Sequence, residues 1–227
     1  MMKRVFNVGM IAAFLIVAAA RVANAAPISW VDWTSSTINS VTGNIDGIGV
    51  TYSGEVLFAQ TSGGTNYWNP GTPYVSTAVD NAPPASDIIA LIGGSGSGTQ
   101  TITFSSPVTN LFMAIVSLGQ PGYPVTYNFD QPFDVLSYGP GYWGGPGTLT
   151  ELPGNVVEGI EGHGTIEFLG TFSSLSFTVP TAENWHGFTV GIDPELQPAA
   201  PVPEPATLSL LGLGFAASAM RKLRRKK

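Results

Sequence analysis

The carboxylates nearest a histidine are the first candidates for chemistry. Glu158 and Glu161 precede His163, and Glu167 follows it. A pair of carboxylates can hydrolyse a glycosidic bond, one as the acid and the other as the nucleophile or base. Residues 158–164 include three glycines, however, and a glycine-rich turn normally exposes its charges to solvent. We therefore predict no catalytic residue and no enzyme, and a glycoside hydrolase is the third function in order of preference.

Two glycine- and proline-rich segments place a tyrosine next to a tryptophan. Tyr67 and Trp68 lie in the first segment, and Tyr142 and Trp143 lie in the second. Flat rings on rigid loops can stack on the apolar faces of pyranose sugars, while neighbouring amides bond the hydroxyl groups. The rings can equally fold back and cap the ends of the fold. Both interpretations, a glycan-stacking site and a packed cap, stay open at this point.

Oxygen donors in turns suggest calcium as a further option. Carboxylates without cationic partners favour hard divalent ions, but Asp and Asn are also ordinary turn formers. The sequence contains no EF-hand spacing and no repeat. We therefore predict no cofactor and no defined metal site, with a structural calcium ion as the alternative. The candidate donors are Asn44, Asp46, Asp80, Asn81, Asp87, Asp130 and Asp134.

The distribution of charge excludes several classes of function. All nine Lys and Arg residues lie in segments 1–21 and 221–227, and of the 15 carboxylates only Glu204 lies outside 26–203. Segment 26–203 therefore has 14 carboxylates and no Lys or Arg. It lacks the cations that neutralise phosphates, so we predict no nucleic-acid binding. The chain has no cysteine, which excludes disulfides, thiol catalysis and cysteine-based zinc sites.

Residues 26–195 are predicted to form one all-β domain, a single antiparallel β-sandwich of jelly-roll type. Apolar and polar residues alternate with a period of two in 101–104 and 175–179, and no stretch combines a helical period with caps. Many short strands between Gly, Pro and Asn clusters are typical of such folds. A final strand is expected after a packed Trp185. The expected strands are 49–52, 55–59, 87–92, 99–104, 108–117, 125–129, 133–138, 164–169, 172–179 and 187–192.

The N-terminal residues 1–25 have the features of a secretory signal peptide. Two basic residues, Lys3 and Arg4, precede an apolar run. The small residues Ala23 and Ala25 then form a small-x-small cleavage pattern. We therefore predict that the secretion machinery exports the chain and that the mature protein begins at Ala26.

The C-terminal part contains a second apolar run, after a proline-rich linker at 196–202. Residues 206–220 would form a helix of about 22 Å, which is short for a hydrocarbon core of ~30 Å. The basic segment 221–227 follows at once and should stay in the cytoplasm. We predict a transmembrane helix over 206–220 that anchors the chain transiently, with the body outside. The sandwich is thus flanked by a signal peptide and a transmembrane sorting helix.

The run Val-Pro-Glu-Pro-Ala-Thr at 202–207, followed by the apolar and basic segments, resembles the PEP-CTERM sorting signal. The resemblance covers about 26 residues, and the predicted sorting domain is 203–227. It implies that a membrane enzyme, exosortase, reads the tail and cleaves at or near Pro203, Glu204 and Pro205. It also implies an association with exopolysaccharide or biofilm.

These features together predict an exported protein of the cell surface or extracellular matrix. It would be membrane-anchored before processing and then at the surface or outside the cell. Its predicted role is structural or adhesive within an exopolysaccharide layer, with extracellular polysaccharide as a partner beside exosortase and the membrane. The alternative is a carbohydrate-binding module that recognises a defined glycan.

Overall fold

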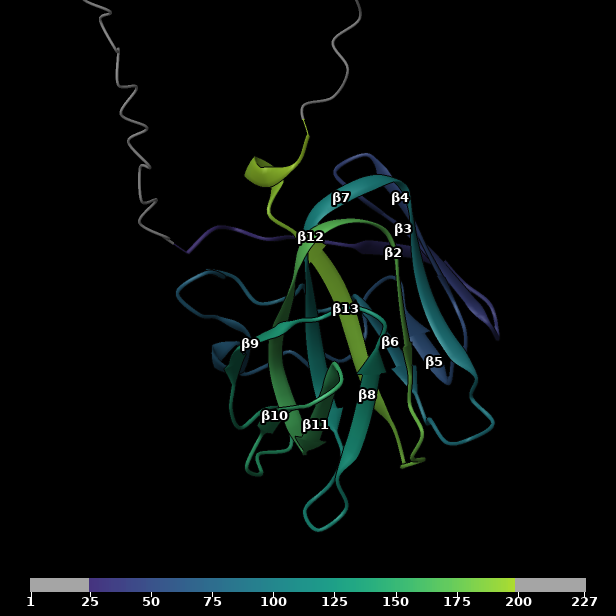
Figure 1. Ribbon diagram of the computed structural model, residues 1–227, viewed down its shortest axis with the longest axis vertical. Helices are drawn as coiled ribbons and strands as arrows, with labels where there is room; N and C mark the ends of the chain where they lie inside the picture. Colours follow the sequence, from purple (N-terminus) through teal and green to yellow (C-terminus); the bar gives the residue numbers. More distant parts are fainter. Residues whose placement is uncertain (1–24, 199–227) are drawn as a thin grey trace, which may run out of the picture.

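The computed structural model describes residues 25–198 (Figure 1). The expected signal-peptide body, Ala23, the sorting motif and the expected helix 206–220 lie outside these residues, as does most of the linker 196–202. Within the described part, no helix is long and apolar enough to cross a membrane. The predicted scissile bond lies at the edge of this part. Ala25 is exposed, whereas the Ala26 N–H donates to the Ala78 carbonyl and the Ala26 carbonyl accepts from the Asp80 N–H.

The described residues form thirteen strands that hydrogen bonds join into one sheet, with antiparallel pairing between all neighbouring strands. Two short 3₁₀ turns, η1 (Thr72–Tyr74) and η2 (Pro194–Leu196), are the helical elements of this part. The strands are β1 (Ser29–Trp30), β2 (Asp32–Ser36), β3 (Ser40–Ile45), β4 (Ile48–Ser53), β5 (Phe58–Gln60), β6 (Ile88–Leu91), β7 (Thr99–Leu118), β8 (Val125–Phe129), β9 (Asp134–Tyr138), β10 (Thr148–Leu152), β11 (Val156–Ile160), β12 (Gly162–Thr178) and β13 (His186–Ile192).

The two longest strands, β7 and β12, hold the sheet together. The first part of β7 pairs with β4 and with the end of β12, and its second part pairs with β13 and the start of β12. Both strands bend where these parts meet (Figure 1). Asn110 and Gly170 have positive φ angles there, and the Gly170 N–H donates to Asn110 Oδ1 over 3.0 Å. The bend folds the sheet over a common core.

Aromatic rings fill this core and join strands from the two parts of the sheet. Phe177 in β12 lies 4.9 Å from Tyr127 of β8 and 5.5 Å from Phe188 of β13, between ring centroids. Phe129 at the end of β8 lies 4.9 Å from Phe168 in the other part of β12. All five rings are buried. Because truncating a buried Phe costs about 3–5 kcal/mol, this cluster is a major source of the free energy of unfolding.

The prediction of an all-β antiparallel fold is confirmed, whereas the division into the two sheets of a jelly-roll sandwich is not shown by this continuous pairing. Strand 125–129 has the predicted bounds. Runs 99–104 and 108–117 form one strand, β7, instead of two, and runs 164–169 and 172–179 likewise merge into β12.

The prediction of a glycine-rich turn at 158–164 is wrong. β11 continues to Ile160 and β12 begins at Gly162, so only Glu161 separates them. The glycines serve close packing instead of a turn. A Cβ on Gly159 would overlap Leu118, and one on Gly162 would overlap Leu149.

Candidate functional site

Four aromatic side chains form one patch, and we call Tyr67, Tyr142, Trp143 and Trp185 the aromatic patch. The Tyr67 ring centroid lies 5.2 Å from Tyr142, 5.6 Å from Trp143 and 5.0 Å from Trp185. Trp143 is 4.8 Å from Tyr142 and 5.1 Å from Trp185. The side chains of Tyr142 and Trp143 are 43% and 47% exposed. The two predicted aromatic loops therefore meet, and each contributes rings to one surface.

One of the four predicted stacking residues does not belong to this surface. Trp68 is fully buried and packs edge-on against Tyr74, with 5.1 Å between ring centroids. The first loop therefore divides, with Tyr67 in the patch and Trp68 in the core. The structure adds Trp185 to the patch. The sequence indicated it only as a packed residue before the last strand, and it is half-buried there.

A pocket of about 190 Å³ opens beside the patch. Its walls combine two ring systems with carboxylate, hydroxyl and amide groups, which is the composition of a site for a polar ligand with apolar faces. It lies where β7 ends and β13 begins. The lining residues are Ser117, Gln120, Trp143, Glu161, Glu183, Asn184 and Trp185.

Glu161 is held in the pocket by one hydrogen bond and lies near a histidine. Ser117 Oγ donates to Glu161 Oε1 over 2.7 Å, and His163 Nε2 lies 3.6 Å from the same oxygen, beyond hydrogen-bond distance. Ser117 and Glu161 also have φ angles of 59° and 52°, which non-glycine residues other than Asn and Asp rarely adopt. Such conformations cost about 1–3 kcal/mol and concentrate at functional sites. Glu161 is therefore not the freely solvated turn charge that the sequence indicated.

Glu183 forms the second acidic wall. Its Oε1 accepts from the Gly119 N–H over 2.8 Å and lies 2.8 Å from His186 Nδ1. The Glu183 side chain is 1% exposed, compared with 14% for Glu161. Glu161 is thus the carboxylate that a ligand in the pocket can reach.

His163 lies beneath the patch as a neutral ring. Its Nδ1 accepts from the Ser117 backbone N–H over 3.4 Å and lies 3.1 Å from the Tyr74 hydroxyl. Burial raises the pKa of Tyr74, so its hydroxyl stays protonated as a donor. Burial also lowers the pKa of His163 from 6.5 to about 4. The ring stacks near Trp143 at 6.3 Å, and a Cβ on Gly141 would overlap it, so His163 supports the second aromatic loop.

The buried His163 should make the protein less stable in acid. The folded state keeps the ring neutral, while the unfolded chain binds a proton below about pH 6.5. The contribution of His163 to the free energy of unfolding should therefore fall by up to about 3 kcal/mol between pH 6.5 and pH 4. Burial raises the pKa values of Asp87 and Glu167, which acts in the opposite direction. Urea unfolding of the wild type and His163→Gln across this range isolates the histidine, and equal pH slopes in both chains would contradict its role.

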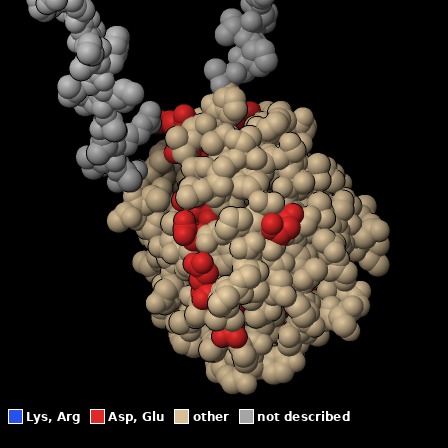
Figure 2. All heavy atoms as spheres, viewed as in Figure 1, with Lys and Arg blue, Asp and Glu red and all other residues tan. Residues whose placement is uncertain are grey.

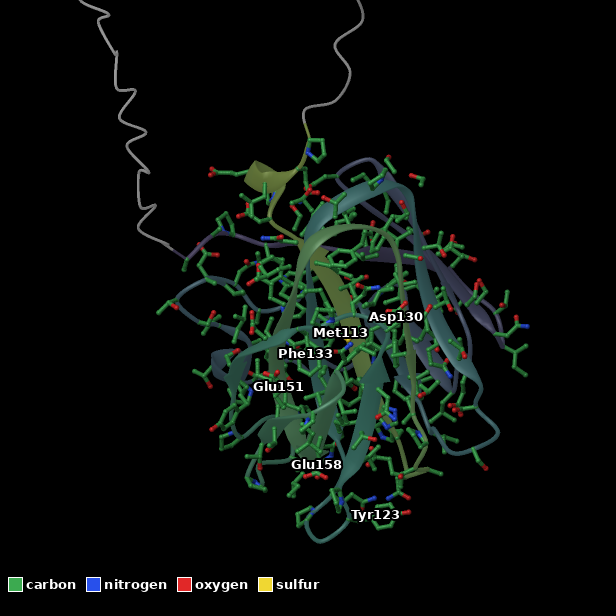
Figure 3. The ribbon with its side chains drawn as sticks, in the orientation of Figure 1. Met113, Tyr123, Asp130, Phe133, Glu151 and Glu158 are labelled. Carbon is green, nitrogen blue, oxygen red and sulfur yellow. The ribbon has the colours of Figure 1, made fainter. Side chains whose placement is uncertain are left out.

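The remaining acidic candidates lie elsewhere. Glu158 lies in β11, opposite Thr150 of β10 and Thr126 of β8, and Figure 3 labels it together with Glu151 and Asp130. Figure 2 shows the carboxylates of the viewed side as separate spots with no Lys or Arg among them. Glu167 lies directly opposite Asp134 of β9. The structure therefore separates Glu158 and Glu167 from the residues that line the pocket.

Four of the seven candidate calcium donors already accept hydrogen bonds. The side chains of Asn44, Asn81, Asp87 and Asp130 each accept a hydrogen bond from a backbone N–H. Asp46 has a φ of 49° in the turn between β3 and β4. Within residues 25–198, no three His, Asp or Glu side chains stand close enough together to hold a metal ion. These interactions and the turn conformation of Asp46 give five of the seven candidates a structural role.

The match between this chain and a known family model lies at its C-terminal end. No curated protein and no solved structure matches it. Residues 201–226 match the family model described as the PEP-CTERM protein-sorting motif, and this segment contains Pro203, Glu204 and Pro205. The motif implies export, membrane anchoring before processing, and recognition by exosortase. The chain therefore carries a PEP-CTERM protein-sorting motif at residues 201–226.

Proposed function

We propose that this is a non-enzymatic protein of the cell surface or matrix, with a structural or adhesive role in an exopolysaccharide layer. The secretion machinery would remove residues 1–25, and helix 206–220 would anchor the chain until exosortase releases it. The backbone contacts of Ala26 with Ala78 and Asp80 support this order, because the residue expected to begin the mature protein is already part of the folded body. The two parts of the bent sheet, packed on one core, support a jelly-roll-like sandwich as the body.

The observation that supports the proposal best is the place of the aromatic patch relative to the tail. β13 begins with His186 beside the pocket and ends at Ile192, from which the chain continues through η2 toward the sorting motif. Seven residues of strand separate these ends by about 20 Å. β1 pairs with the Ile192 end, so the N-terminal side leaves there too. An anchored chain would thus hold its exposed rings away from the membrane.

Recognition of a defined glycan is the second candidate function, and the exposed rings favour it. Aromatic side chains beside amides and carboxylates have the composition of sugar-stacking sites. In this arrangement Tyr67, Tyr142, Trp143 and Trp185 would contact the sugar, while Trp68 would only support the loop from below.

The two tryptophans of the predicted loops should respond differently to truncation. Trp143→Ala removes an exposed ring, so polysaccharide pull-down should weaken about tenfold while the melting temperature changes little. Trp68→Ala leaves a cavity in the core, so it should lower the free energy of unfolding by about 3–5 kcal/mol. Thermal melts and pull-downs with polysaccharide extracted from the producing cells measure both effects. A collapse of stability in Trp143→Ala would instead assign its ring to the core.

A further inference from the structure

The pocket contains an acidic group that lacks a positive counterpart. Glu161 is mostly buried, and in residues 25–198 there is no Lys or Arg to pair with it. Its histidine neighbour does not supply the charge, because Ser117 N–H points at His163 Nδ1 and burial keeps that ring neutral. His163 Nε2 is buried and has no hydrogen-bond partner among the described residues. Buried charges are normally paired with an opposite charge, so the carboxylate of Glu161 is available to pair with a cationic ligand.

Two aromatic rings line the same pocket as Glu161. They belong to Trp143 and Trp185, and Tyr67 and Tyr142 pack against them. The faces of Trp and Tyr rings attract ammonium groups, and aromatic cages are used to recognise them. The rings therefore select the same kind of ligand as the carboxylate does.

We infer that this pocket binds an organic ammonium group, and that the group is the free amine of an amino sugar in a polysaccharide. The choice of a polysaccharide rests on the proposed function, whereas the choice of an amine rests on Glu161 and the rings. The amine would lie beside Glu161, and the sugar ring would lie against Trp143 or Trp185. Ser117, Gln120 and Asn184 supply donors and acceptors for the hydroxyls.

The size of the pocket and the charge of its carboxylates limit the ligand further. The pocket volume of about 190 Å³ is below the ~300–1,000 Å³ that encloses a drug-sized molecule, so it fits one monosaccharide unit. Glu161 and Glu183 both repel a carboxylate or sulfate. Uronic-acid and sulfated polysaccharides are therefore excluded, and N-acetylation of the amine should remove most of the affinity.

The test is calorimetric titration of the full-length protein in detergent. The probes are a glucosamine tetrasaccharide with free amines, its fully N-acetylated counterpart, and spermidine. The Glu161→Gln variant keeps the acceptor for Ser117 Oγ but removes the charge, so it should bind the free-amine probe at least about tenfold more weakly. Glu158→Gln is the matched control, and it should bind like the wild type. Attraction of unlike charges also predicts that wild-type affinity falls as salt is raised.

The outcomes separate the two proposals. Preference for the free-amine sugar, lost in Glu161→Gln, supports the inference. Equal binding of both tetrasaccharides overturns the ammonium assignment and leaves polysaccharide binding standing. Spermidine binding as tightly as the amino sugar overturns the polysaccharide source. Binding of no probe overturns the inference, while pull-down with the native polysaccharide still decides the proposed function. If Glu161→Gln does not fold, the salt dependence of wild-type binding decides the question. An affinity for the free-amine probe that does not change with salt would then overturn the role of the Glu161 charge.

Discussion

Trypsin is expected to leave residues 22–221 in one piece. This should hold for the folded protein and also for chains that are unfolded in 8 M urea and then diluted into protease buffer. The enzyme requires Lys or Arg, and the sequence has neither between Arg21 and Arg221. Folded proteins commonly resist proteases because cleavage needs local unfolding. Here the resistance should persist without the fold, because the substrate residues themselves are missing. Gel electrophoresis and mass spectrometry of the digest measure it.

A single substitution provides the control for this experiment. Ile38 lies between β2 and β3 with 85% of its side chain exposed. Ile38→Lys should therefore create one tryptic site without disturbing the core, and the digest should yield fragments ending and starting there. A Glu-specific protease should cut the unfolded wild type at many positions, which shows that the chain is accessible. Internal tryptic cleavage of the wild type would contradict the expectation.

The absence of cations also determines how the body is stabilised. No Lys–carboxylate pair can form in residues 25–198, so apolar burial and hydrogen bonding must provide the stability. The sheet even places Asp134 directly opposite Glu167, and like charges in that position are destabilising. The pKa of Glu167 is raised by burial and by the nearby Asp134 and Asp193. Cross-strand pairs elsewhere and the five-ring core offset this repulsion.

The sequence predicted the strands best where burial follows a simple pattern. In 125–129 and 187–192 the strands are close to their predicted bounds, because both segments are bounded by turn residues and rich in β formers. β1, β2, β3, β10 and β11 were missed. In β2 and β3, Ser, Thr, Gly and Asn on mostly exposed faces do not alternate clearly, and the end of β11 lies in the segment 158–164 that we expected to form a turn. β7 and β12 each join two predicted strands into one. This continuity depends on β-bulges and on the bend at Asn110, and the local sequence pattern indicates neither.

The candidate site was predictable only as a set of residue types. Sequence identified the two aromatic loops, but Tyr67 and Trp68 are adjacent, and only packing against Tyr74 decides which one is buried. Glu161 was noted and then assigned to a solvated turn, because glycines that allow close packing resemble glycines that make turns. The pocket joins the end of β7 to the start of β13, residues 117–120 to 183–185, and no spacing in the sequence indicates that contact.

The sorting motif yields the second large effect, in residues outside the described part. Replacing Glu204 with Ala should block processing and leave the protein at full C-terminal length in the membrane. Proline fixes its own φ angle and biases the residue before it toward extended backbone, so we expect the enzyme to read Pro203, Glu204 and Pro205 as an extended peptide. Glu204 is the one ionisable side chain between them. Its removal takes away the charge that distinguishes this tripeptide from the neighbouring proline-rich linker.

Mass spectrometry of membrane and extracellular fractions from a host that contains exosortase gives the readout. Wild-type protein should lose the tail 206–227 and leave the membrane fraction, whereas Glu204→Ala should keep both. Glu195→Ala is the matched control, since Glu195 lies in the exposed η2 turn ahead of the motif, and this variant should be processed like the wild type. The same mature mass and location for Glu204→Ala and the wild type would show that the enzyme reads the prolines or the apolar segment alone. Retention of both variants would instead place the requirement in the general acidity of the C-terminal region.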